Sequence, residues 1–228
     1  MNNSSDPGND VTLTRGGKRA TRKRGKSANG TRKKGRKTGK KNSSGNIVFD
    51  DYPEFRPNLT PQEIFKRGSF GGTYWRPIYS SVTKKHYKNK HKAYPASWWK
   101  GIPNDWLTRD WDDYDTSINK YGVKVGTTLE FWECKKWIHE QNPYGWMQWY
   151  CDFYTGKRGP DDQRQIDRWK KTAGPRSRFR RALINLLKRK GADYNDFTIS
   201  PKVRQTLQHW GYVLTKKDFN AKYSLSTD

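Results

Sequence analysis

Aromatic rings, more than aliphatic side chains, are the material from which this chain must build a core. Only 31% of its 228 residues are hydrophobic, yet 14% are aromatic, including 11 Trp and 13 Tyr. Disordered chains are poor in such residues, and a buried Trp or Tyr removes a large apolar area from water. The composition therefore predicts a folded, aromatic-rich body. No stretch approaches 18 consecutive apolar residues, so we expect no membrane-spanning segment and no membrane partner.

The first 45 residues differ in composition from this body. They carry 14 Lys and Arg side chains against two acidic ones, Asp6 and Asp10. After Met1, only Val11 and Leu13 are apolar and larger than Ala, so burial cannot offset the entropy of ordering. We predict a disordered basic arm over residues 1–45 that neutralises nucleic-acid phosphates. Its phosphate-binding residues are Arg15, Lys18, Arg19, Arg22, Lys23, Arg24, Lys26, Arg32, Lys33, Lys34, Arg36, Lys37, Lys40 and Lys41.

Two other functions of such an arm stay open. Runs of Lys and Arg also serve as nuclear targeting signals, here at Lys18–Lys26. A solubilising tail has the same composition.

Helix start and stop signals recur through residues 46–215, which we predict to be one folded domain, mainly α with a minor β element. Capping boxes begin at Thr60 and Thr127, and apolar residues recur at three and four positions. The predicted helices span residues 61–67, 127–141, 142–155, 160–173, 175–190 and 200–210. Residues 68–126 are rich in Gly and aromatic side chains and predict turns and a hairpin at 73–87. We expect residues 216–228 to form a flexible tail.

A second basic region covers residues 157–190, which carry 13 basic and 3 acidic side chains. Helical spacing predicts that the basic residues avoid the apolar stripe and share exposed faces. The predicted phosphate-binding residues of this region are Arg164, Arg168, Lys171, Arg176, Arg180 and Arg181. Three short helices within residues 155–212 would form a helical nucleic-acid-binding subunit, although its spacing is not that of a helix-turn-helix motif. A solvated basic face gives the same pattern.

Basic side chains also alternate with aromatic ones between residues 75 and 94. Aromatic rings beside cations can stack exposed bases. In a chain with so few aliphatic residues, however, we expect most of these rings, such as Trp75 and Tyr94, to be core. His86 and His91 lie in a Lys-rich segment and are expected at the surface.

Asp110, Asp112, Asp113 and Asp115 form an acidic cluster that could hold a metal ion for phosphodiester hydrolysis. A two-metal nuclease collects ligands from several elements, and no second set stands out. The cysteines and histidines lack zinc-site spacing, and phosphate-loop and nucleophile-elbow motifs are missing. We therefore predict a protein that is not an enzyme, with no metal, cofactor or small-molecule substrate. A metal-dependent nuclease is the third of our three hypotheses.

Five segments resemble those of a known family. They are Tyr52–Asn58, Gly68–Ile78, Asn142–Tyr150, Asp162–Trp169 and Ser200–Gly211. In this order, over about residues 50–212, they resemble an uncharacterised family of small aromatic-rich proteins from algae, fungi and large DNA viruses. The resemblance implies no activity, cofactor or site residue, because none is assigned to that family. A viral source would favour association with a virion or a genome.

The first hypothesis that follows is a nucleic-acid-binding protein, with DNA favoured over RNA and little sequence preference. The second is a structural or adaptor protein of a virion or chromatin-like assembly, with an acidic protein partner. The first ten residues contain no apolar stretch typical of a secretory signal. We accordingly expect an intracellular protein, in the nucleus or a virion, with Cys134 and Cys151 as free thiols.

Overall fold

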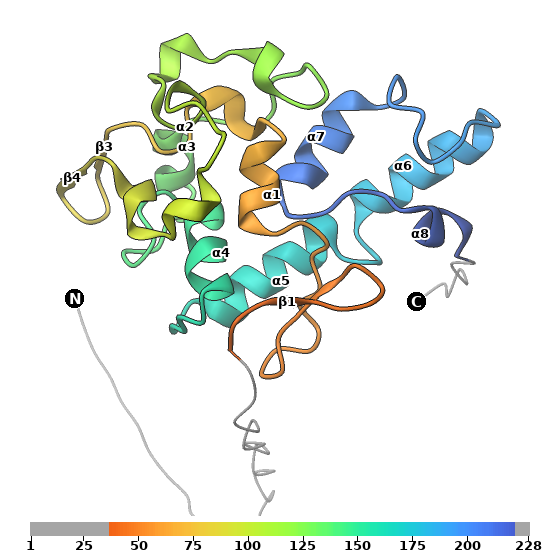
Figure 1. The fold of residues 1–228 in the computed structure, drawn as a ribbon, viewed down its shortest axis with the longest axis horizontal. Coiled ribbons are helices and arrows are strands. Elements are labelled where there is room, and N and C mark those ends of the chain that lie inside the picture. The colour runs from red at the N-terminus through yellow and green to blue at the C-terminus, as the bar shows by residue number, and fades with distance from the viewer. Residues whose placement is uncertain (1–36, 222–228) are drawn as a thin grey trace, which may run out of the picture. The chain divides into compact units, whose positions relative to one another are not determined.

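The computed structural model describes residues 37–221, and these form a mainly α body with two small sheets (Figure 1). The helices are α1 (Pro61–Lys66), α2 (Asp105–Thr108), α3 (Leu129–Cys134), α4 (Trp146–Tyr154), α5 (Asp162–Ala173), α6 (Arg178–Arg189), α7 (Pro201–His209) and α8 (Lys216–Asn220). The strands are β1 (Lys40–Lys41), β2 (Ile47–Val48), β3 (Ile78–Ser80) and β4 (Lys85–Tyr87). The predicted fold class is confirmed.

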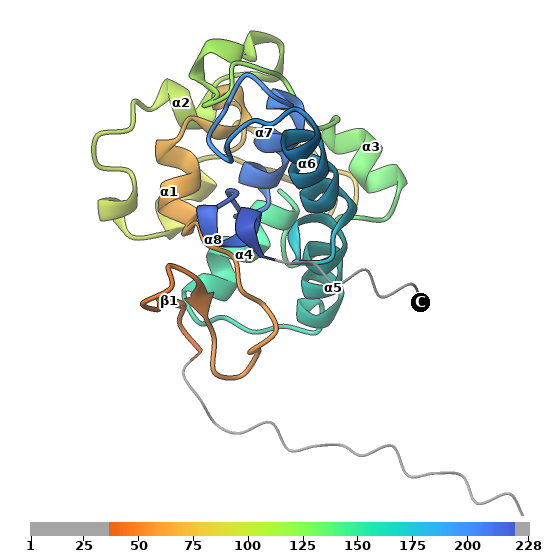
Figure 2. The same ribbon diagram turned by 90° about the vertical axis from the view of Figure 1, so that its right-hand side faces the viewer.

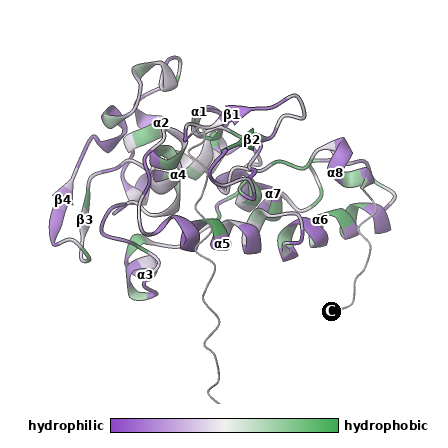
Figure 3. Ribbon diagram, turned by 90° about the horizontal axis from the view of Figure 1, so that it is seen from below, coloured by the Kyte–Doolittle hydropathy of each residue, from purple (hydrophilic) through white to green (hydrophobic). Residues whose placement is uncertain are grey.

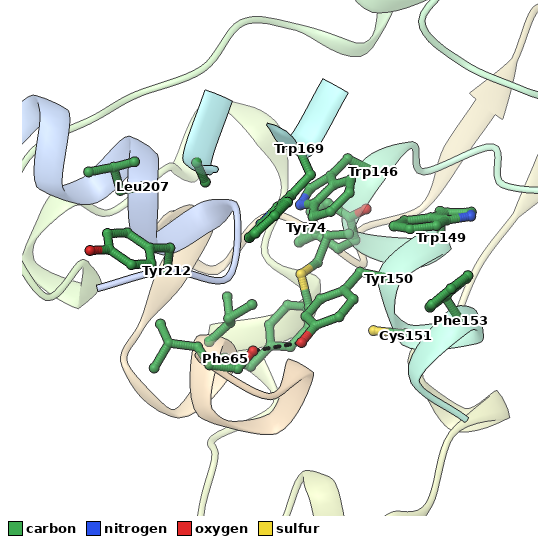
Figure 4. Packing of buried hydrophobic residues seen from close by; sticks show 14 of the residues in the cluster. Phe65, Tyr74, Trp146, Trp149, Tyr150, Cys151, Phe153, Trp169, Leu207 and Tyr212 are labelled. Atoms are coloured by element: carbon green, nitrogen blue, oxygen red, sulfur yellow. Dashed lines mark hydrogen bonds between the residues drawn. The ribbon is translucent and has the colours of Figure 1, made fainter. Parts of the chain in front are cut away.

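Helix α4 lies at the centre of the core and is buried on almost every side, as expected for a helix with apolar side chains all round. Its rings Trp146, Trp149, Tyr150 and Phe153 pack with Trp169 of α5 (Figure 4). Phe55 is fully buried among these five rings, at centroid distances from 5.1 to 6.1 Å. Most of these contacts are edge-to-face, the arrangement that ring quadrupoles favour. Aromatic side chains therefore build the core, as the composition predicted.

Helices α5, α6 and α7 pack in series beside α4 (Figure 2). The start of α5 is fixed by Asp162, whose carboxylate accepts hydrogen bonds from the Trp149 indole at 2.9 Å and from the Gly159 amide at 3.0 Å. A carboxylate in the first turn also suits the helix dipole. These two hydrogen bonds tie the start of α5 to α4.

The prediction of one helix over residues 127–141 is wrong in its length. Helix α3 ends at Cys134, and Lys136 adopts a left-handed conformation with φ of 55°. Gly145, with φ of 81°, separates this turn from the start of α4. Ile138 and Tyr144 lie between these two breaks and are buried against the core. Tertiary packing therefore overrides the local helical signal.

The predicted boundary of the basic arm at residue 45 is also wrong, because residues 37–45 are part of the folded body. Strand β1 pairs with β2 in antiparallel register. The Gly39 amide donates to the Tyr154 carbonyl at 2.9 Å, and Lys41 pairs with Glu63 at 2.6 Å. The driving force is the burial of Ile47 and Phe49, which brings the preceding residues against the body.

Part of the predicted C-terminal tail is helical as well. Thr215 caps α8, its hydroxyl accepting from the Asp218 amide at 3.1 Å. The Tyr212 hydroxyl donates to the Asp218 carboxylate at 2.8 Å. Helix α8 lies close to α6 (Figure 1). Residues 222–228 lie outside the described part of the chain.

The predicted hairpin is present but shorter, with β3 and β4 paired so that Ile78 faces Tyr87. It lies at the end of the body opposite to α6 (Figures 1 and 3).

Across residues 37–221, the helices are all too short or too polar to span a lipid bilayer.

Candidate nucleic-acid interface and an aromatic cavity

Helix α6 has one apolar face and one basic face. Ser177 caps it by accepting from the Arg180 amide at 3.3 Å, and Leu183, Ile184 and Leu187 are buried against the body. Hydrophilic and hydrophobic stretches accordingly alternate along its ribbon (Figure 3). The exposed cations on and beside the opposite face, called the α6 face below, are Arg176, Arg178, Arg181, Lys188, Arg189 and Lys190.

Within residues 37–221, the α6 face has no internal counter-ions. Among the described residues, none of its six side chains lies within 4.0 Å of a carboxylate. Arg176 and Arg181 were predicted as phosphate-binding residues and lie on it. The four other members, Arg178, Lys188, Arg189 and Lys190, were not predicted to bind phosphate, although the helical period of the sequence also places them away from the apolar stripe.

Arg180 does not lie on the α6 face, so its prediction as an exposed phosphate-binding residue is wrong. Its side chain is only 5% exposed, and its guanidinium lies over the Tyr212 ring, 4.0 Å from the centroid. One of its nitrogens is 3.2 Å from an Asp218 carboxylate oxygen. The segment that covers it, residues 212–220, includes α8, which the sequence did not predict.

The face predicted from Arg164, Arg168 and Lys171 on α5 is not a single exposed surface. Arg164 is held by Asp161, with nitrogen–oxygen distances of 2.5 and 2.8 Å. Arg168 is half-buried and donates to the Gln165 side chain at 2.9 Å. Only Lys171 is exposed to solvent.

The residues predicted to bind phosphate in the arm fall into two groups. Lys37, Lys40 and Lys41 are exposed on the body, where Lys41 pairs with Glu63 and the Lys37 carbonyl accepts from Arg158. The others lie outside the described residues: Arg15, Lys18, Arg19, Arg22, Lys23, Arg24, Lys26, Arg32, Lys33, Lys34 and Arg36.

The hairpin and the segment that follows it carry a second basic surface at the other end of the body. Its exposed lysines, called the hairpin lysines below, are Lys84, Lys85, Lys88 and Lys92. Trp75 and Tyr94 are buried, as expected of core rings, whereas Tyr79 is 50% exposed. The prediction of a surface position is wrong for His91, which is buried and has its pKa lowered by that burial and by Lys92.

The acidic cluster does not converge with other ligands. Asp110, Asp112 and Asp113 are exposed. Asp115 accepts from the Ser117 hydroxyl and amide at 2.6 and 2.8 Å, and these hydrogen bonds lower its pKa. Within residues 37–221, no three His, Cys, Asp or Glu side chains are grouped so that they could hold a metal ion.

A cavity of about 300 Å³ opens between segments that are far apart in the sequence. It is bounded by the start of α4, by α3 and the loop after it, by α5 and α7, and by the turn at Phe70. Ten of its 23 lining residues are Trp, Tyr or Phe, including Trp111, Phe131, Trp137 and Trp210. Sequence reasoning missed this cavity, because its ring positions belong to at least five segments and each ring taken alone resembles a core residue.

Two arginines contribute the positive charge of the cavity wall. The guanidinium carbon of Arg76 is 5.0 Å from the Trp111 ring centroid. That of Arg168 is 5.5 Å from the Trp137 ring and 5.3 Å from the Trp210 ring. Burial lowers the pKa of both arginines, and burial together with nearby Arg164 lowers that of Arg168 to about 10.

His209 contributes a neutral imidazole to the same wall. Its Nε2 accepts from the Phe70 amide at 3.2 Å, and its ring stacks on that of Phe70 at 4.1 Å between centroids. Complete burial lowers its pKa to about 3, so the ring carries no charge at neutral pH.

Both cysteines are free thiols, as predicted, with Cys134 exposed and Cys151 buried. Burial raises the pKa of Cys151 well above its ordinary value, so this thiol is unreactive.

No family model, curated protein or solved structure matches the chain. The resemblance of the five segments to an uncharacterised family therefore stays a prediction, and the proposals below depend on this chain's own residues.

Proposed function

We propose that this protein binds nucleic acid without catalysing a reaction, and that the α6 face is where its folded body contacts phosphate. The observation that carries this proposal is the α6 face itself, which gathers six exposed cations with no carboxylate within 4.0 Å among the described residues. Lysine and arginine side chains that contact phosphate release condensed counter-ions from the nucleic acid. Cations already paired within the protein would have to break those pairs first.

The dimensions of α6 support the proposal. The helix has 12 residues and is about 18 Å long at a rise of about 1.5 Å per residue. A duplex of that length carries about ten phosphate charges, at one charge per about 1.7 Å. The α6 face can therefore meet several phosphates at once. Such contacts carry no sequence information, so we propose little sequence preference, with DNA favoured over RNA.

The arm would add a second contribution. Residues 1–36 include 11 of the 14 basic side chains predicted in the arm and both of its acidic residues. Lysine and arginine side chains need no fixed fold to neutralise phosphate. We propose that the arm supplies most of the affinity and that the α6 face orients the body on the nucleic acid.

The test is the salt dependence of duplex DNA binding by the full chain and by a variant with Arg178→Gln, Arg181→Gln, Lys188→Gln and Arg189→Gln. Each phosphate contact that is lost reduces the slope of log affinity against log salt by about 0.9. We expect the slope to fall by two to four such steps, equally for unrelated DNA sequences. The melting temperature should be unchanged, because all four side chains are exposed.

The matched control changes all four hairpin lysines to Gln and so removes the same charge at the opposite end of the body. We expect this variant to keep most of the slope. Equal losses in the two variants would show that only overall charge matters. An unchanged slope in the α6 variant would mean that this face is merely solvated, and either result overturns the proposal.

A further inference from the structure

We propose that the aromatic cavity binds a small aromatic anion, with its ring between the indoles of the wall and its carboxylate or phosphate group against the Arg168 guanidinium. This site lies on other elements than the α6 face and does not depend on the proposed binding of nucleic acid.

The cavity has the size and lining of a small-molecule site. A volume of about 300 Å³ is at the lower end of the range for such pockets, about 300–1,000 Å³. Ring faces and edges form much of its surface, and they pack best against another flat ring. Phe131 and Trp137 line it and are each 41% exposed, with their rings 5.7 Å apart at the centroids. The cavity is thus within reach of a ligand from solvent.

Arg168 supplies the charge that selects an anion. Its guanidinium lies between the Trp137 and Trp210 rings, and among the described residues no carboxylate is within 4.0 Å of it. Its hydrogen bonds to the described residues leave from Nη1, to the Gln165 side chain at 2.9 Å and to the Trp137 carbonyl at 3.4 Å. Neighbouring Arg164, by contrast, is neutralised by Asp161.

Arg168 is half-buried and has no carboxylate within 4.0 Å among the described residues, and burial together with Arg164 disfavours its charged form and lowers its pKa. An anion in the cavity would relieve this cost through a charge-assisted hydrogen bond. A neutral ring of the same shape would gain the stacking contacts alone. Preference for the anion over its neutral isostere is therefore the specific prediction of the proposal.

The test compares naphthalene-1-acetate with naphthalene-1-acetamide, which differ in charge but hardly in shape, and adds 1-naphthyl phosphate. Binding to the full chain is measured by titration calorimetry at physiological salt. We expect one site per chain and an affinity for the acetate at least about tenfold above that for the acetamide. The tighter of the two anions identifies the acid group as carboxylate or phosphate.

Variants assign the preference to residues. Arg168→Met should reduce the preference strongly, leaving only the contribution of Arg76, while the acetamide binds as before. Arg168→Lys should retain more of it. Trp137→Leu should weaken both ligands, because it removes a stacking surface. Arg181→Met on the α6 face removes the same charge outside the cavity and should change neither.

Each of the following results would overturn the proposal: equal binding of acetate and acetamide by the wild-type chain, no binding of either at millimolar concentration, or a preference that Arg168→Met leaves undiminished. If near-ultraviolet circular dichroism shows that the Arg168→Met variant does not fold, a measurement on the wild-type chain tests the proposal instead. The Nε–H resonance of Arg168 should then shift with the acetate and not with the acetamide, and the absence of that difference also overturns the proposal.

Discussion

The Arg180 guanidinium lies 3.2 Å from an Asp218 carboxylate oxygen, and the next residue, Arg181, is exposed on the α6 face. Two adjacent arginines thus have opposite roles. One joins α6 to α8 and stacks on Tyr212, and the other is available to an external anion. Because the two side chains share a helix and carry the same charge, substituting each in turn distinguishes an effect on protein stability from an effect on nucleic-acid binding.

We predict that Arg180→Met destabilises the protein and that Arg181→Met does not. Removing one partner of a fully buried ion pair costs about 3–5 kcal/mol. Since Asp218 is 30% exposed, we expect a lower cost, about 2 kcal/mol of unfolding free energy, from urea denaturation. Arg181→Met should stay within about 0.5 kcal/mol of the wild type and should weaken DNA binding. Equal stabilities for the two variants would contradict the structure around Arg180.

His209 should make the protein less stable in acid. Its pKa is about 3 in the folded protein, below its ordinary value of 6.5. The unfolded chain therefore binds a proton between these values that the folded protein does not, and unfolding becomes easier as pH falls below about 6.5. The contribution of His209 is fully present above that pH. It is lost at up to about 1.4 kcal/mol per pH unit down to about pH 3.

The check is the difference in unfolding free energy between the wild type and His209→Gln from pH 7 to pH 4. The Gln side chain can still accept from the Phe70 amide but does not titrate. We expect the two stability curves to converge as the pH falls. Parallel curves would show that His209 is not the group responsible.

Gly68 should not tolerate a side chain. It adopts φ of 64°, and a Cβ atom there would lie 1.7 Å from the Ile118 carbonyl oxygen. Gly191 provides the matched control, because it has nearly the same φ, 63°, and nothing lies within 4 Å of its Cβ position. Gly191→Ala should cost about 1–2 kcal/mol for the left-handed conformation alone. Gly68→Ala should cost clearly more or prevent folding, as measured by thermal unfolding.

Residues 37–45 should contribute to stability. We predict that the fragments 37–228 and 46–228 both unfold cooperatively, and that the shorter one has the lower melting temperature. The shorter fragment lacks β1 and the hydrogen bond from Gly39 to Tyr154, which leaves one edge of β2 without its partner. Identical melting temperatures would show that residues 37–45 do not stabilise the body, and that the arm extends to residue 45 as the sequence predicted.

The sequence predicted those features that depend on local chemistry. Thr60 and Ser200 mark the starts of α1 and α7, and the apolar period of α6 locates its exposed face. Features set by distant segments could not be predicted in this way. Whether Arg180 is exposed depends on α8, and whether Trp137 is core or cavity wall depends on α5 and α7. A single sequence contains no direct record of such contacts.

The position of Phe55 has a consequence for how the protein folds. Its ring meets Trp146 and Trp169, and nearby the Tyr150 hydroxyl reaches the Leu59 carbonyl across 91 residues of chain. Helical proteins usually fold fast because most of their contacts are local. Here the central ring cluster can form only after a long loop has closed, and the entropy of that closure is lost before any ring is buried. We therefore expect this mainly helical body to fold more slowly than helical proteins whose contacts are mostly local.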